Sequence, residues 1–156
     1  MNIRHATPQD ISQIWNLIVA LAVNENALEK VKLEKGDISE YLFGASPCLF
    51  ALIAEENNEI LGIALYYYRI STWVGKTLHL EDLVVSEHAR GKGIGSQLFK
   101  ALAQVALDSN SRRIDWEVSI GNNKGKAFYA QLGADFEENW RICRMEHKAI
   151  ADLCAQ

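Results

Sequence analysis

The segment that begins at Leu80 and runs through a predicted helix over 94–107 constrains the fold of this chain more than any other. Apolar Leu83, Val84 and Val85 predict the end of a buried strand, and a glycine-rich loop then opens directly into the amphipathic helix. This arrangement directs several backbone N–H groups and the positive end of a helix dipole at one point. Glycines also let an anion approach the backbone closely, because they have no Cβ. The predicted anion-binding residues are Arg90, Gly91, Lys92, Gly93, Ile94, Gly95 and Ser96.

The common nucleotide-binding motifs do not fit this loop. A G-x-G-x-x-G motif that begins at Gly91 would need its third glycine at Ser96, and a P-loop would need Ser or Thr where Gly93 stands. The stretch 121–127 also fails, because its first spacer is one residue short and Ala127 replaces the hydroxyl residue. Spacing alone leaves two interpretations open, a phosphate site or a tight connection without a ligand.

The composition is that of a globular protein with no basic excess. A length of 156 residues, of which 49% are hydrophobic, predicts a single domain over 1–156 with its own core. The net charge of −4 argues against nucleic-acid binding. No apolar run reaches the ~20 residues of a membrane span, and the N-terminus lacks the apolar core of a signal peptide. We therefore expect a cytoplasmic protein.

The three cysteines lack C-x-x-C spacing, so neither a disulfide framework nor a metal site is expected.

Hydrophobic periodicity and turn residues predict a mixed α/β (α+β) sheet with helices on both faces. Thr7 and Pro8 predict a helix start, and Gly44 and Gly133 predict helix ends. Helices are expected over 11–22, 37–43, 94–107 and 124–132, and strands over 48–54, 60–70, 78–85, 112–120 and 140–147.

Two motifs together resemble those of the GCN5-related N-acetyltransferases (GNAT). That family uses Arg-x-x-Gly-x-Gly, met here as Arg90, Gly93 and Gly95, for the coenzyme A pyrophosphate. Further on, Asn122 precedes Phe128-Tyr129 and a Gly-Ala pair, which is similar to a second GNAT signature without its usual spacing upstream of Phe128. Over the whole chain, the motifs at 80–83, 73–76 and 140–141 resemble the spermidine/spermine and thialysine N-acetyltransferase branch.

The resemblance implies the GNAT fold and direct transfer of acetyl from acetyl-CoA to a primary amine of a small molecule, in a ternary complex. It also implies a homodimer. The residues that the resemblance assigns to coenzyme A are Leu83, Val84, Val85, the loop and helix start over 90–96, Asn122 and Phe128.

The resemblance also implies how the amine is activated. An alkylammonium with a pKa of ~10.4 must lose a proton before it attacks, at a cost of ~4.6 kcal/mol at pH 7. Glu81 is the implied base, through an ordered water, with Asp82 as a binding or relay group, and Tyr129 is the implied acid for the leaving thiolate. A backbone N–H near Val85 would meet the oxyanion.

Other interpretations of these side chains stay open at this point. On a regular strand Glu81 and Asp82 point to opposite faces, so they serve one substrate only if a β-bulge is present; otherwise one of them is merely solvated. The helical spacing of Tyr129 also fits a core aromatic, and the isolated His79 and His88 are interpreted as structural or solvated residues.

The resemblance also implies three further positions that bear on the choice of amine, namely Glu25, Trp73 and Trp140. An alternative interpretation of Trp73 is that it only anchors its loop. The chain departs from the polyamine enzymes at Ser71-Thr72, where they carry an acid and a proline, and at a shorter acidic segment before Trp140. Because fewer remote carboxylates weaken a long polycation most, we expect a short amine. The alternatives are a protein or peptide N-acetyltransferase and a non-catalytic coenzyme A-binding module.

Overall fold

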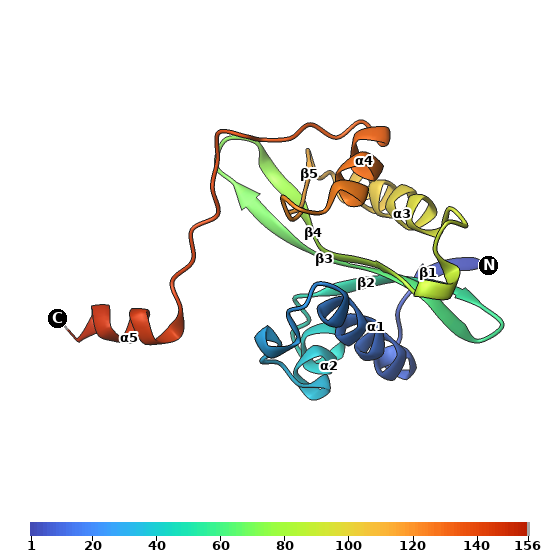
Figure 1. The fold of residues 1–156 in the computed structure, drawn as a ribbon, viewed down its shortest axis with the longest axis horizontal. Coiled ribbons are helices and arrows are strands. Elements are labelled where there is room, and N and C mark those ends of the chain that lie inside the picture. The colour runs from blue at the N-terminus through green and yellow to red at the C-terminus, as the bar shows by residue number, and fades with distance from the viewer. Residues whose placement is uncertain (156) are drawn as a thin grey trace. The chain divides into compact units, whose positions relative to one another are not determined.

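The computed structural model describes residues 1–155 and divides into two compact units, Met1–Glu117 and the residues from Val118 onward (Figure 1). Each unit is described by itself below. The single domain over 1–156 stays a prediction.

A five-stranded mixed sheet forms the centre of the first unit, and its strands lie side by side in chain order. Only the last pair of strands is parallel, and the other three pairs are antiparallel. This confirms the predicted mixed sheet, and adds a short first strand that sequence analysis missed. The strands are β1 (Asn2–His5), β2 (Phe50–Glu56), β3 (Glu59–Ser71), β4 (Gly75–Val85) and β5 (Ile114–Asp115).

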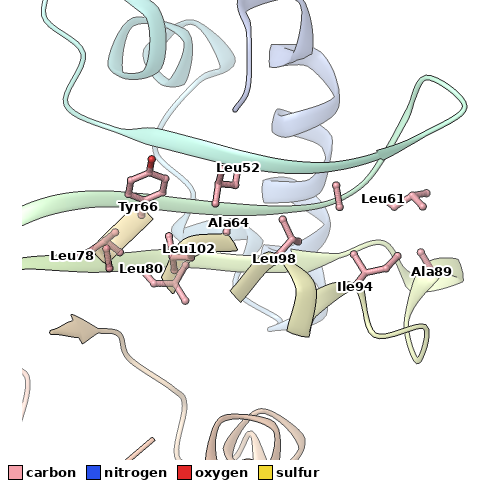
Figure 2. Close-up of a cluster of buried hydrophobic side chains, with 12 residues drawn as sticks. Leu52, Leu61, Ala64, Tyr66, Leu78, Leu80, Ala89, Ile94, Leu98 and Leu102 are labelled. Carbon is pink, nitrogen blue, oxygen red and sulfur yellow. The ribbon is translucent and has the colours of Figure 1, made fainter. Parts of the chain in front are cut away.

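Helices cover both faces of this sheet, as predicted. Helices α1 (Ile11–Asn24) and α2 (Lys35–Phe43) pack on one face, here called the α1–α2 face. Helix α3 (Ile94–Asp108) packs on the other, the α3 face, where Leu98 and Leu102 lie against the strands (Figure 2). In both layers most of the apolar side chains that form the core are almost fully buried. The fold is the predicted α/β arrangement.

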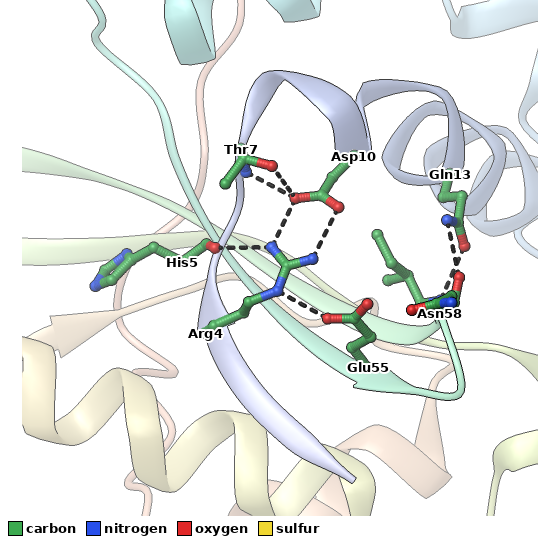
Figure 3. Close-up of polar contacts among 8 residues, drawn as sticks. Arg4, His5, Thr7, Asp10, Gln13, Glu55 and Asn58 are labelled. Carbon is green, nitrogen blue, oxygen red and sulfur yellow. Dashed lines mark hydrogen bonds and ion pairs between the residues drawn. The ribbon is translucent and has the colours of Figure 1, made fainter.

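An ion-pair network connects β1 to the start of α1 (Figure 3). Both terminal nitrogens of Arg4 donate to the Asp10 carboxylate at 2.7 and 3.0 Å, and Arg4 Nε donates to Glu55 on β2 at 2.8 Å. Asp10 also accepts hydrogen bonds from the backbone and side chain of Thr7. The bonds from Arg4, followed by those from Thr7, lower the pKa of the buried Asp10 carboxyl to about 2.

Two predicted strands are wrong in extent or in kind. The strand expected over 112–120 is only β5, which pairs with Leu78 and His79 and stops just before β4 becomes irregular. The strand expected over 140–147 is absent from the part of the chain that the structure describes, because no strand there pairs with it. The apolar residues of 140–145 are exposed, and α5 (His147–Cys154) follows.

Helix α4 (Asn123–Gln131) belongs to the second unit and confirms most of the helix expected over 124–132. Asn122 is its N-cap, and the Oδ1 atom of Asn122 accepts a hydrogen bond from the Gly125 backbone at 2.8 Å. Gly133 follows with a φ of +85°, a conformation that favours glycine and ends the helix where the sequence predicts.

Candidate active site

A β-bulge in β4 decides where the two acidic side chains of the predicted site lie. Leu65 of β3 pairs with Asp82, whereas the next residue, Tyr66, pairs with Leu80, so Glu81 has no partner in β3. In a bulge of this kind two residues of one strand oppose one residue of the other.

The bulge reverses which residues of β4 face each side of the sheet. Leu78 and Leu80 lie in the core under α3, but beyond the bulge Leu83 and Val85 pack there and Val84 lies under α1 and α2. Asp82, opposite Leu65, is thereby placed on the α1–α2 face. The condition under which Glu81 and Asp82 can serve one substrate is met.

The Glu81 carboxylate also lies toward the α1–α2 face. Its Oε2 atom is 3.9 Å from Nε2 of His79, a residue paired with Tyr67 on the same face as Leu65. The Glu81 side chain is 53% exposed, so its carboxylate is accessible to solvent. A cation that approaches this face meets two carboxylates.

Burial sets the charge of Asp82. Desolvation, with a smaller contribution from the negative charge of Glu81, raises the pKa of the Asp82 carboxyl to about 6. The same two causes, in the same order, raise the pKa of the Tyr67 phenol. Within residues 1–155 the Asp82 carboxylate has neither a hydrogen bond nor an ion pair, so an incoming cation would be its first partner.

The glycine-rich loop has the backbone geometry expected of an anion cradle. Gly91 and Gly93 both have a φ of +76°, and Gly93 is the N-cap of α3. No atom lies within 4 Å of where a Cβ of either glycine would stand, so their surroundings are open. Arg90, Lys92 and the loop glycines at 91 and 93 are exposed, as is Ser96.

Two residues fasten this loop to the core. Ile94, the first residue of α3, is only 3% exposed and packs in the core between α3 and the sheet, so its side chain anchors the loop and its backbone alone is available to a ligand (Figure 2). Arg90 Nε donates a hydrogen bond to the backbone carbonyl of Val85 at 3.1 Å, which holds the guanidinium over the end of β4.

One edge of β4 is unpaired beside the loop. Strand β5 pairs with β4 at Leu78 and His79, so among the described strands the residues 80–85 have a neighbour on the β3 side alone. The Val85 carbonyl accepts from Arg90, and the other backbone N–H and C=O groups along this edge need partners. This is the stretch over which Leu83, Val84 and Val85 are expected to contact the arm of the coenzyme.

Asn122, Phe128 and Tyr129 all lie on or beside α4 in the second unit. The rings of Phe128 and Tyr129 lie 5.1 Å apart in a T-shaped contact, and both side chains are half-buried. Asn122 already uses its side-chain oxygen as the cap of α4. This assigns Asn122 a structural role, while its expected contact with coenzyme A stays a prediction.

The residues expected to select the amine lie at the ends of elements. Glu25 is the C-cap of α1, and Trp73, 85% exposed, lies in the turn between β3 and β4. Trp140 follows α4 in the second unit. The part of these three residues in the choice of amine stays a prediction.

Sequence analysis did not assign His79 to the site. Its spacing of two residues from Glu81 on a predicted strand was the available signal, because such residues share a face. Within residues 1–155 no group of three or more histidine, cysteine, aspartate or glutamate side chains could hold a metal ion. The helices of that part of the chain are too short or too polar to cross a bilayer.

A comparison with protein families agrees with these features. The family model of the acetyltransferase (GNAT) family matches residues 12–134. The chain belongs to this family. Membership confirms the predicted enzyme class, an N-acetyltransferase.

Curated relatives fall in the branch that sequence analysis predicts. The chain is 34% identical over 161 residues to a human spermidine/spermine N(1)-acetyltransferase-like protein 1. The alignment covers 97% of this chain but only 23% of that longer protein. It is 33% identical to the thialysine N-epsilon-acetyltransferase of Bos taurus, with 99% of this chain and 97% of that protein covered. Among solved structures, an integron cassette protein from the mobile metagenome of V. cholerae has a TM-score of 0.82 at 26% identity, over 99% of this chain and 98% of that one.

Proposed function

We propose that this protein transfers an acetyl group from acetyl-CoA to a primary amine of a small molecule. The observation that carries the proposal is the β4 bulge, which leaves two carboxylates on one sheet face within a few residues of an open glycine cradle. The carboxylates lie near the end of β4 and the glycine loop follows that same end, so a site for a cation and a site for an anion are close together. This combination suits an amine and a thioester that carries a nucleotide.

The residues present fit coenzyme A. Backbone amides over 90–96 and the start of α3 would hold its pyrophosphate, with Arg90 and Lys92 adding positive charge. The unpaired edge at Leu83–Val85 would hold its arm. When bound, acetyl-CoA supplies an acetyl group activated as a thioester.

We assign two proton transfers to side chains of this protein, one from the substrate ammonium and one to the leaving thiolate. We assign Glu81 as the base that takes a proton from the bound ammonium, directly or through a water. Asp82 would strengthen ammonium binding once ionised, which its raised pKa allows only above about pH 6. Tyr129 would donate its phenolic proton to the leaving thiolate, and a backbone N–H near Val85 would stabilise the oxyanion.

A short amine is the proposed substrate. The carboxylates that the structure groups together are adjacent, so they can neutralise one ammonium rather than a spaced series of them. The relatives are named for spermidine/spermine and for thialysine. Thialysine or a short diamine fits this pair better than spermine does, because a long polycation requires remote acids.

We further propose a cytoplasmic homodimer, the assembly that the resemblance implies. The exposed apolar side chains of the second unit support an intermolecular contact, among them Ile142, Met145, Ile150 and Leu153. Light scattering at micromolar protein tests this proposal, because a monomer mass there would contradict it.

A panel of amines tests the substrate class. Thiol release from acetyl-CoA is followed with thialysine, 1,3-diaminopropane, spermidine, spermine and a lysine peptide, and coenzyme A binding is measured separately by calorimetry. We expect the highest kcat/KM with the short amines. Turnover on the peptide alone would replace the proposal with a protein acetyltransferase, and binding without any turnover would indicate a coenzyme A-binding module.

A further inference from the structure

His79 is a buried histidine whose hydrogen bonding is incomplete. The residue is 8% exposed, and within residues 1–155 its Nδ1 atom is buried without a hydrogen-bond partner. Buried polar atoms in native proteins are nearly always paired, and an unpaired one costs about 1–3 kcal/mol. Packing alone does not account for an imidazole at a position where an apolar ring would avoid this cost.

The other nitrogen of His79 faces the proposed base. Nε2 lies 3.9 Å from Glu81 Oε2, within ion-pair range but longer than a hydrogen bond. The ring is held on its other side by Tyr67, whose ring centroid is 4.9 Å away at an interplanar angle of 38°. The imidazole is therefore fixed in orientation, and a small rotation of the Glu81 side chain would complete the hydrogen bond.

Glu81 is the carboxylate that interacts with the His79 side chain, because the other nearby acid is already neutralised. Asp115, its pairing partner on β5, already forms ion pairs with Arg69 at 2.7 Å and with Arg113 at 2.6 Å. Helix α1, which also packs against β4, carries no charged residue. Two further ionisable groups are coupled electrostatically to this cluster: Asp82, whose carboxyl is affected by the charge of Glu81, and Tyr67, whose phenol is affected by Glu81 and Glu117. Helix α2 on the same face carries Lys35, Asp37 and Glu40, all of them exposed.

Glu81 needs such a neighbour because of the bulge. It has no cross-strand partner in β3, and its side chain is 53% exposed, so neither pairing nor packing fixes its rotamer. An exposed glutamate samples several rotamers, and only some of them point the carboxylate at the amine. It is therefore an inefficient base unless another group orients it.

We propose that His79 is a positioning residue for Glu81. An adjacent carboxylate favours the Nε2–H tautomer, in which Nε2–H donates toward Oε2 and Nδ1 keeps only a lone pair. This donor orients the carboxylate toward the amine and stabilises the ionised form that accepts the proton. His79 neither gains nor loses a proton in the transfer. The role rests on the proposed function of Glu81.

Kinetics provide the first test. His79→Phe removes the donor and keeps a ring against Tyr67, His79→Gln keeps a side-chain N–H, and His5→Phe makes the same change at an exposed histidine on β1 of the same sheet. We expect His79→Phe to lower kcat about tenfold and to move the acid limb of the kcat–pH profile upward by about 0.5–1 pH unit. His79→Gln should recover part of both effects, and His5→Phe should show neither. An unchanged acid limb in His79→Phe would overturn the proposal.

Nitrogen NMR of the histidines provides a test that needs no turnover. The tautomer of His79 is obtained from long-range ¹H–¹⁵N correlations at pH 8, with its signals assigned by their loss in His79→Gln. We expect Nε2–H in the wild-type protein and a loss of this preference in Glu81→Ala, which has no side-chain acceptor. An Nδ1–H tautomer, or the same tautomer in Glu81→Ala, would contradict the proposal even for a protein inactive on every amine. Inactivity of the wild type would count against the proposed function alone.

Discussion

Asp82 pairs with Leu65 across β3 and β4, although the next residue of β3, Tyr66, pairs with Leu80. This one-residue excess in β4 moves the Asp82 carboxylate out of the alternation of a regular strand and places it, half-buried, on the face that Glu81 and His79 share. The site therefore depends on a local irregularity of a strand, and its chemistry follows from how that irregularity changes burial and charge.

Asp82→Asn should stabilise the protein at high pH. The folded state raises the pKa of this carboxyl from 3.8 to about 6, so it binds the proton more tightly than the unfolded state does. The free energy of unfolding of the wild type therefore falls as pH rises through this window. Removing the charge should gain up to about 3 kcal/mol at pH 8 and little at pH 4.

Urea unfolding at both pH values measures this gain. Asp135→Asn, at an exposed position of the second unit, is the matched control and should change stability little at either pH. An equal effect of Asp82→Asn at pH 4 and pH 8 would show that the Asp82 carboxyl is not perturbed by burial.

Asp10→Asn should have the opposite sign. Arg4 and Thr7 hold the pKa of Asp10 at about 2, below its ordinary 3.8, so its ionised form stabilises the fold above about pH 4 and this stability is lost as pH falls toward 2. We expect a loss of about 2–3 kcal/mol at pH 7 and a smaller loss at pH 2.5. Urea titrations at the two pH values measure it, and Asp37→Asn at the start of α2 serves as a control at an exposed ion. A loss that does not shrink at pH 2.5 would contradict the role of the Arg4 pair.

Gly93→Ala should weaken coenzyme A binding. A φ of +76° strains any residue with a Cβ by about 1–2 kcal/mol, even though the space around Gly93 is open. The loop is expected to relax away from this conformation and to turn its amides out of the cradle. Calorimetry with coenzyme A should show a Kd raised about tenfold or more. Gly36→Ala, inside α2 with the same open space, should leave binding unchanged and raise stability slightly. Unchanged affinity in Gly93→Ala would place the pyrophosphate elsewhere.

Tyr129→Phe tests the proposed acid. Loss of a general acid lowers kcat about 10²–10⁴-fold without a matching effect on coenzyme A affinity. Steady-state thiol release and calorimetry on the same variant separate the two quantities, and Tyr68→Phe, at a half-buried position of β3, is the matched control. A kcat within twofold of the wild type would leave Tyr129 as a packing residue beside Phe128.

Local sequence patterns predicted the parts of this fold that local physics determines. The strand, glycine loop and helix around Gly93 follow from glycine conformation and apolar periodicity, and the helix end at Gly133 is likewise local. The cap at Asn122 is also local, but sequence analysis assigned Asn122 to coenzyme A and did not predict it. The short strand β1 has no such signal, because its four residues become a strand only by pairing with β2. The segment 140–147 has a strand-like pattern but no partner strand in the described residues, so pattern alone gave the wrong result.

The sequence predicted what the geometry of the site requires, a β-bulge beside Glu81 and Asp82, but not whether the bulge is present. Adjacent Glu81 and Asp82 require a bulge to act together, but its position depends on how β3 and β4 pack around Leu65 and Leu80. The contact between His79 and Glu81 depends on the same register. Long-range pairing therefore sets the part of the site that composition and spacing leave open.

Mass spectrometry of the amine product tests the central proposal most directly. Acetyl-CoA and a short amine such as thialysine are incubated with the wild type, with Glu81→Gln and with the exposed-glutamate control Glu87→Gln, each at pH 7. We expect acetylated amine from the wild type and from Glu87→Gln, and at least a hundredfold slower formation by Glu81→Gln. Full activity of Glu81→Gln, or no acetylated small amine from the wild type, would contradict it.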